Sequence, residues 1–317
     1  MIPRTTKALC LGSALFLATS LAACGDGDTS DASGESLSGS ISIDGSSTVA
    51  PLSEAAAEIF MQEHPDVSVT VGTSGTGGGF EKFCRGETEI SNASREIKDE
   101  EVKLCKEGGV TYEQINVAND GLAVIVHPDN TWAECLTVDE LKAMWEPKAT
   151  TKTWKDVDAK FPADAFKLYG PGSDSGTFDY FTEAINGEEG VIRSDYSDIG
   201  EDDNAAITGV SGNKNAMAFV PLSFVQEAGD KVKAIKVEND KGECVAPSEE
   251  TVQNSTYNPL GRQLFVYPSE KSLEKPEVGE FLKFYIEKND EVTEAAGFIP
   301  LTEEQAKEST ALVDSLK

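Results

Sequence analysis

Along the chain, short apolar runs alternate with segments in which hydrophobic residues recur at the 3.6-residue spacing of a helix. A strand is predicted at 41–43, a turn at 45–48, and then a helix that opens with Pro51. The same order recurs at 66–72, at the turn 74–79 and in a helix beginning at Phe80, and again as a strand at 89–92 with a helix after it. Strand, loop and helix repeated in this way predict an α/β fold with a mainly parallel sheet.

The pattern continues through the second half of the chain. A buried strand at 121–128 precedes a helix at 137–147, for which Thr137 is the predicted N-cap and Glu140 the third helical residue. Strand, loop and helix follow within 166–185. Further strands are predicted at 215–225, 231–239 and 260–267, and an amphipathic helix at 276–288.

Three of the predicted loops share one design. "DGSST" (44–48), "SGTGGG" (74–79) and "GSDSGT" (172–177) each follow a strand and stand at a helix start. A helix N-terminus presents free N–H groups and the positive end of its dipole, glycine allows close approach, and hydroxyls donate further bonds. Turn and capping chemistry explains any single loop. Three loops, with "NASR" (92–95) as a fourth, predict a shared anion site.

The first residues are predicted to direct export. Arg4 and Lys7 precede a mostly apolar segment, 8–23, that is too short for a bilayer span. "LAAC" (21–24) resembles a bacterial lipobox, which implies a signal peptide at 1–23 and lipid on Cys24. The alternative is an ordinary signal peptide with a chance cysteine. The polar segment 24–40 is predicted to be a flexible tether, and we expect the protein to be anchored to the outer face of the cytoplasmic membrane or periplasmic.

Charge and cysteine content restrict the classes of function that fit the chain. The chain carries a net charge of −29, and removing Arg4 and Lys7 with the signal takes it to −31. Such acidity excludes a sizeable nucleic-acid footprint, and an anion site must overcome it locally. Four cysteines remain besides Cys10 and Cys24, an even set that suggests two disulfides with three connectivities open. The absence of a CxxC motif argues against zinc, and we expect no metal and no cofactor.

Longer motifs carry a family resemblance. "IDGSSTVAPL", "GTSGTGGGFEKFCRGETEISNASREI", "GLAVIVHPDNTWAECLTVDELKAMWEP" and "GPGSDSGTFDYF" resemble the phosphate-binding lipoprotein of the phosphate ABC transporter, the PstS family. The resemblance covers nearly all of the chain after the tether. It implies a type II periplasmic-binding-protein fold, in which two α/β lobes joined by a two-strand hinge close on one phosphate ion. It also implies a monomer that delivers phosphate to the permease subunits.

The resemblance also implies which residues bind the ligand. Carried over from the family, the expected ligands are Ser47, Thr48, Thr76, Gly77, Ser175, Gly176 and Thr177. The same four loops offer Ser94, Arg95, Ser173 and Asp174 as further candidate ligands. The chain departs from the family pattern in two places. Many members have Asp after the "AS" of the fourth loop and Arg just before the third, where this chain has Arg95 and Pro171. A guanidinium can bind two oxyanion oxygens, whereas the alternative for Arg95 is a surface pair with Glu96 or Asp99.

Loss of the usual aspartate raises the question of selectivity. Phosphate at neutral pH keeps a proton and sulfate has none, so a carboxylate acceptor favours phosphate. Asp174 is the hypothetical acceptor, and Asp120 and Asp44 are second choices. The alternative role for Asp174 is a turn residue that caps the next helix.

The family fold implies lobe boundaries and a disulfide pairing. Crossovers near 117–120 and 259–263 place lobe one at 41–118 with 264–317, and lobe two at 119–263. Cys84–Cys105 then lies within lobe one and Cys135–Cys244 within lobe two, while other pairings would bridge the lobes and oppose hinge motion.

Other classes of function fit the sequence less well. The two histidines, His64 and His127, each precede a proline, "GSDSG" is not a G-x-S-x-G elbow, and no His and Asp cluster suggests a metallophosphatase. We therefore expect a binding protein and no enzyme. The remaining alternatives are a binding protein for sulfate or molybdate, and a scaffold lipoprotein that would not need anion-cradling loops.

Overall fold

The first third of the chain builds a parallel sheet with helices between its strands. The computed structural model describes residues 36–173, 175–200 and 202–316, so the predicted signal peptide, Cys24 and Asp174 lie outside the described residues. In order, the elements are β1 (Gly39–Gly45), α1 (Ala50–Glu63), β2 (Val67–Gly72), α2 (Gly75–Cys84), β3 (Ile90–Ala93) and α3 (Asp99–Gly108). β1 pairs in parallel with β2 and with β3, so the loops that follow these strands meet at one edge.

The middle of the chain forms a second set of strands and helices. Its elements are β4 (Ile115–Val126), β5 (Cys135–Leu136), α4 (Val138–Trp145), α5 (Trp154–Val157), β6 (Lys167–Gly170), α6 (Gly176–Phe181), β7 (Ser197–Asp198), α7 (Asp203–Ser211), β8 (Ala216–Pro221), α8 (Leu222–Ala228), β9 (Lys233–Ala234), β10 (Lys236–Glu238), β11 (Cys244–Val245) and α9 (Glu249–Gln253). A single π-helical turn, Thr182–Asn186, continues α6. β6 lies between β7 and β8, parallel to both, and β5, β10 and β11 make a small separate sheet.

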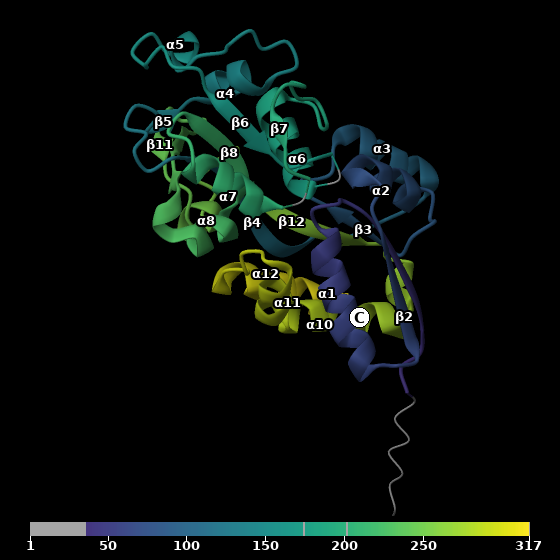
Figure 1. Cartoon of the computed structure of the whole chain (residues 1–317). Coiled ribbons are helices and arrows are strands. Elements are labelled where there is room, and N and C mark those ends of the chain that lie inside the picture. The colour runs from purple at the N-terminus through teal and green to yellow at the C-terminus, as the bar shows by residue number, and fades with distance from the viewer. Residues whose placement is uncertain (1–35, 174, 201, 317) are drawn as a thin grey trace, which may run out of the picture. The chain divides into compact units, whose positions relative to one another are not determined.

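Two long strands connect the two halves (Figure 1). β12 (Gly261–Pro268) pairs antiparallel with β4, and each also pairs with a strand of one half, β12 with β3 and β4 with β8. The strand order is β2-β1-β3-β12-β4-β8-β6-β7. The prediction of a mainly parallel sheet is therefore wrong for the whole sheet, because β4 and β12 introduce antiparallel pairs at its centre. Helices α10 (Pro276–Glu287), α11 (Asn289–Ala296) and α12 (Glu303–Ser315) follow.

The buried hydrophobic residues form separate cores on the two sides of this strand pair. One large cluster draws its fully buried members from 41–118 and 264–313. The other draws them from 122–260, joined by Ile299. A third, smaller cluster surrounds the Cys84–Cys105 disulfide with Phe80, Phe83 and Tyr267. The second disulfide, Cys135–Cys244, pairs residues of the middle segment, so both disulfides have the pairing that the family resemblance implies.

Two local predictions are corrected by the structure. The glycine-rich segment 75–79 is the first part of α2 and not a turn before it. Gly79 packs so closely on β1 that a Cβ there would lie 2.4 Å from the Gly45 Cα, so glycine serves close packing within a helix. The predicted strand 215–225 ends at Pro221, and the next residues form α8.

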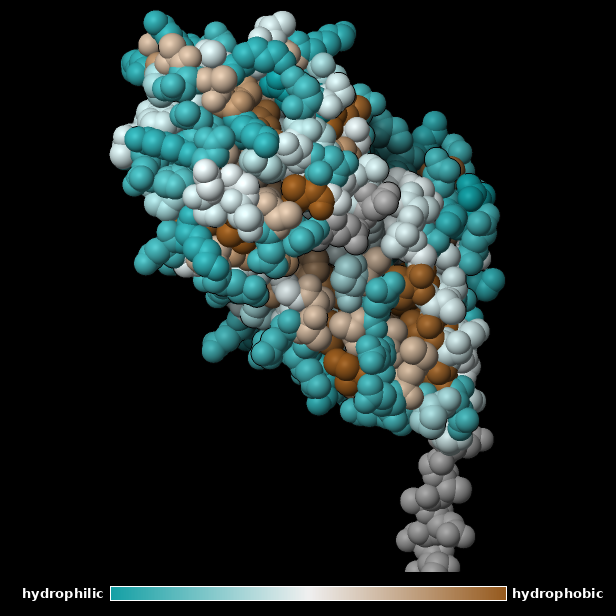
Figure 2. All heavy atoms as spheres, viewed as in Figure 1, coloured by the Kyte–Doolittle hydropathy of each residue, from teal (hydrophilic) through white to brown (hydrophobic). Residues whose placement is uncertain are grey.

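The visible surface is largely hydrophilic (Figure 2). Among the described residues, Val102 is the one large hydrophobic side chain that is exposed, at 40%. Within that same part of the chain, no helix combines the length and the apolar character that crossing a bilayer requires.

Candidate anion-binding site

Four of the predicted ligands line one small cavity where the strand-end loops meet. Its volume is about 10 Å³, room for about one water. The predicted ligands are Ser47 and Thr48 from the loop after β1, Thr76 from the start of α2, and Ser94 from the end of β3. The other lining residues are Ser46, Gly75, Asp179, Tyr180, Glu183, Glu189 and Arg262.

Hydrogen bonds hold these hydroxyl groups in place. The Ser94 backbone N–H donates to Thr76 Oγ1 at 3.3 Å, and the two hydroxyl oxygens are 3.0 Å apart. The backbone N–H of Ser46 donates to the Asn92 carbonyl at 3.0 Å, which ties the first loop to the end of β3. Hydroxyl groups that are already oriented can donate to an anion without a further ordering cost.

Two contacts in the cavity wall join the loop after β1 to α6. The Ser47 hydroxyl donates to Asp179 Oδ2 at 2.8 Å, and the Thr48 hydroxyl donates to the Gly176 carbonyl at 3.1 Å. Because the first loop and α6 belong to different cores, these contacts describe a closed arrangement. Glycine is required at 176, since a Cβ there would lie 2.8 Å from the Cα of Thr48.

Arg262, which the sequence reasoning missed as a ligand, is the cation of the cavity. It lies on β12 opposite Asp120 of β4, and its Nε is 3.3 Å from Asp120 Oδ2. Its other nitrogens donate to Thr48 Oγ1 at 3.0 Å and to the Ser94 carbonyl at 3.3 Å. The guanidinium carbon lies 3.3 Å from the centroid of the Tyr180 ring. A guanidinium fixed on several sides presents its charge with little entropy left to lose.

Carboxylates also line or adjoin the cavity, and burial weakens their ionised forms. Burial raises the pKa of Asp120, and the Arg262 guanidinium opposes this. Burial also raises the pKa of Asp179, against the bond from Ser47 and the charge of Arg262. A carboxylate whose ionised form lacks full compensation is ready to accept a proton or a hydrogen bond.

The other predicted ligands lie around this cavity. Gly176 and Thr177 line a larger neighbouring cavity together with Ser47 and Thr48, and Ser175 caps α6 by accepting from the Thr177 N–H at 3.2 Å. Ser173 is exposed. Gly77 lies in the first turn of α2 and outside the cavity lining.

Arg95 does not line the small cavity but a separate hollow, to which Arg262 and Tyr180 also contribute. Its guanidinium forms two 2.8 Å hydrogen bonds with the Glu101 carboxylate. A longer contact of 3.8 Å reaches Glu183 on the segment after α6. Arg95 thus pairs with an acid of α3, although not with Glu96 or Asp99, which the sequence offered as alternatives.

The residues that sequence reasoning missed left weak signals. Arg262 stands in the apolar run "LGRQLFVY", where a charged side chain in a buried strand indicates a buried partner. Asp179 stands among aromatics in "TFDYF", one turn into a helix that begins at a predicted anion loop. Neither residue lies in a glycine- and serine-rich loop, the feature that marks the predicted ligands.

A fold with two lobes and a candidate anion site between them is that of the two-lobed binding proteins. Residues 30–289 match the family model of the PBP superfamily domain. The phosphate-binding protein PstS of Staphylococcus saprophyticus is 39% identical over 93% of this chain and 90% of its own length. The protein SphX of Synechococcus elongatus is 43% identical over 82% of this chain and 77% of its own.

A solved structure agrees with these relatives. The crystal structure of a possible phosphate binding protein from Planctomyces limnophilus is 40% identical, with a TM-score of 0.85 over 89% of this chain and 99% of that one. The chain belongs to the PstS family of phosphate-binding proteins.

Proposed function

We propose that this protein binds inorganic phosphate outside the cytoplasmic membrane and passes it to the permease of an ABC transporter. One observation carries the proposal: the hydroxyls of three loops and one buried guanidinium converge on one small cavity. Hydroxyls and a fixed guanidinium are the donors that a tetrahedral oxyanion needs. The names of the relatives support phosphate as that oxyanion.

In the proposed site, Arg262 joins the predicted ligands. Thr76 and Ser94 supply hydroxyls, and Arg262 supplies the charge. The hydroxyls of Ser47 and Thr48, which here donate to Asp179 and to the Gly176 carbonyl, would turn to donate to phosphate. Ser173, Ser175, Gly176 and Thr177 contribute the third loop, and Gly77 a backbone N–H from α2. Arg95 remains a proposed ligand, and its side chain would have to leave Glu101 to reach the ion.

We propose Asp179 as the acceptor for the phosphate proton. Asp174 lies outside the described residues, and Asp120 already faces Arg262. Asp44 is occupied by Lys82 at 2.6 Å and by Ser74; burial opposes these partners, but together they lower its pKa. Asp179 lines the cavity, and its raised pKa marks a carboxylate that gains from a proton donor. Asp179→Asn should therefore reduce the ratio of phosphate to sulfate affinity by about tenfold or more. An unchanged ratio would return the role to Asp174.

The mechanism is capture by hinge closure. The proposed lobes, 41–118 with 264–317 and 119–263, are supported by the two cores that meet at β4 and β12. Phosphate that touches loops of both lobes favours the closed state by its differential affinity. We further propose a monomer that lipid on Cys24 holds at the membrane through the tether 24–40, with no chemical step on the ligand.

Calorimetric titration with phosphate and with sulfate tests the function. Tight one-to-one phosphate binding with little response to sulfate is expected. Binding of sulfate or molybdate alone would keep the fold and change the ligand. No binding of any of the three ions by folded, ligand-free protein would refute the proposal and favour a scaffold lipoprotein.

A further inference from the structure

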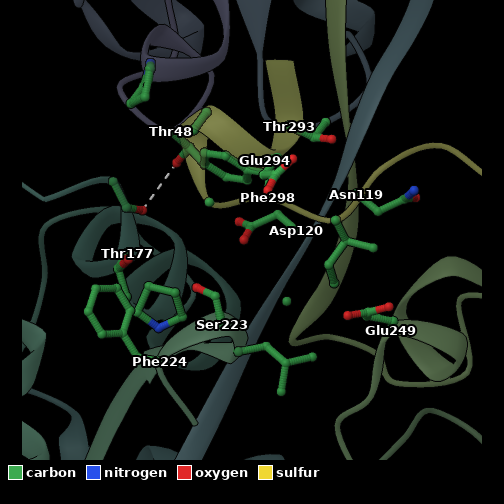
Figure 3. Close-up of a pocket in the computed structure, with 18 of the residues that line it drawn as sticks. Thr48, Asn119, Asp120, Thr177, Ser223, Phe224, Glu249, Thr293, Glu294 and Phe298 are labelled. Atoms are coloured by element: carbon green, nitrogen blue, oxygen red, sulfur yellow. Dashed lines mark hydrogen bonds between the residues drawn. The ribbon is translucent and has the colours of Figure 1, made fainter. Parts of the chain in front are cut away.

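A larger cavity of about 400 Å³ lies beside the small anion cavity and between the two cores. Its walls come from α11 and the residues after it, from Asp120 of β4, and from α8 and α9. Ser47, Thr48, Gly176 and Thr177, which the proposed phosphate site also uses, line the side that faces the anion cavity. Figure 3 shows Glu294 and Phe298 on one side, Ser223 and Phe224 on the other, and Asp120 between them. The bond from the Thr48 hydroxyl to the Gly176 carbonyl stands at the edge shared with the anion cavity. The volume is that of pockets that hold small organic ligands.

The chemistry of this cavity differs from that of the anion site. Phe224 and Phe298 are half-buried in its walls, and Leu222, Pro221 and Ile299 add further apolar surface. None of the described residues that line it is Lys, Arg or His. A second phosphate would therefore find no charged donor there, and the apolar walls disfavour a hydrated metal ion.

Carboxylates supply the charge of the cavity. Asp120 is offset by Arg262, but Glu227 of α8 and Glu294 of α11, both exposed, line the cavity and form no ion pair among the described residues. Glu249 is held at the margin by a 3.1 Å hydrogen bond from the Gln226 amide. Aromatic faces combined with carboxylates are the surroundings that stabilise an alkylammonium group.

We propose that this cavity binds a small organic ammonium ion. The cationic head lies between Glu227 and Glu294, and the apolar body packs on Phe224 and Phe298. Because both lobes line the cavity in the closed arrangement, such a ligand favours closure. Phosphate affinity and ammonium affinity then rise together by the same factor. This coupling rests on the proposed phosphate function, whereas the binding of the ammonium ion does not.

Choline and its neutral analogue 3,3-dimethylbutan-1-ol are the probes, titrated into the purified protein by calorimetry. Choline should bind one-to-one, and the neutral analogue about tenfold more weakly or not at all. Glu227→Gln with Glu294→Gln should weaken choline about tenfold. Glu280→Gln with Glu308→Gln should leave choline binding unchanged, because these residues are exposed like Glu227 and Glu294, line none of the cavities described above, and remove the same charge. Saturating choline should tighten phosphate binding about fivefold.

Three outcomes would overturn the proposal. The first is no choline binding up to about 20 mM in a sample that binds phosphate normally. The second is equal binding of choline and the neutral analogue, which would make the cavity a merely apolar hollow. The third is equal weakening by the two double variants, which would reduce the effect to net charge. Failure of phosphate binding alone would refute the proposed function and leave the ammonium site standing.

Discussion

Replacing Arg262 with glutamine separates the two tasks that the structure gives to this side chain. Arg262 is nearly buried, with 12% of its side chain exposed, and compensates Asp120, of which 9% is exposed. Removing one partner of a buried pair leaves the other charge unpaired, which costs about 3–5 kcal/mol of stability. Arg262→Gln should therefore lower the free energy of unfolding by that order, measured by denaturant unfolding without phosphate.

The loss of ligand affinity is a separate quantity. A charge-assisted hydrogen bond contributes about 1.5–3 kcal/mol, which corresponds to about a 10- to 150-fold weaker phosphate affinity. The double change Arg262→Gln with Asp120→Asn removes both buried charges, so stability should recover in large part while phosphate binding stays weak. Calorimetric titration of the double variant isolates the ligand contribution.

Arg85→Gln is the matched control, because Arg85 is half-exposed, pairs with Glu87 and lines none of the cavities described above. It removes the same charge from an acidic protein and should change phosphate affinity little. If the double variant bound phosphate within about threefold of the unchanged protein, Arg262 would be a structural residue, and the assignment of the cation would be wrong.

Gly176→Ala should weaken phosphate binding at least about tenfold with little loss of stability, because the new Cβ meets the backbone of Thr48 across the closed site. Calorimetry measures the affinity and thermal unfolding the stability. Unchanged affinity would show that closure does not need the contact. Cys135→Ser with Cys244→Ser should lower the free energy of unfolding by about 4–5 kcal/mol, as expected for a closed loop of 109 residues, while phosphate affinity stays the same. Reduced affinity would show that this disulfide also supports the site. The pKa of Asp179 is raised above 3.8 in the folded state, so its favourable contribution is present below about pH 4 and is lost as the pH rises through the raised value. Asp179→Asn should therefore raise the unfolding temperature at pH 7 but not at pH 3 in phosphate-free buffer, and an equal shift at both values would contradict the pKa argument.

The sequence predicted the elements around β1, β2 and β3 because each has a clear apolar run followed by turn residues. It failed at 75–79, where glycines read as a turn but pack against β1 in a helix. It also failed after Pro221, where "LSFV" suits a strand by composition and forms α8 because the β4–β8 pairing ends there. A local sequence pattern does not contain the distance between two elements, and the close packing of α2 on β1 is what requires glycine in this segment.

The residues of the candidate site also fall into a group that local patterns predict and a group that they do not. Ser47, Thr48, Thr76 and Ser94 were predictable because each stands where a strand ends and a helix begins or a loop follows. Arg262 was not, because it lies at the start of a strand more than 200 residues from Thr48, and only the pairing of β12 with β4 and β3 brings it to these loops. A residue on a connecting strand has no local signature of binding.

An acidic chain can hold an anion site because the groups next to the anion, and not the net charge of the chain, decide its binding. The charge of Arg262 is largely offset by Asp120, so the site does not depend on a net positive field. Its donors are hydroxyl groups and N–H groups at helix starts, whose attraction acts over the length of a hydrogen bond. Carboxylates on the exposed surface are screened by salt over about 8–10 Å, which limits their effect on the site. Overall charge then affects mainly the rate of encounter, and the proposed role of the Asp179 carboxylate at the cavity wall concerns the choice between phosphate and sulfate.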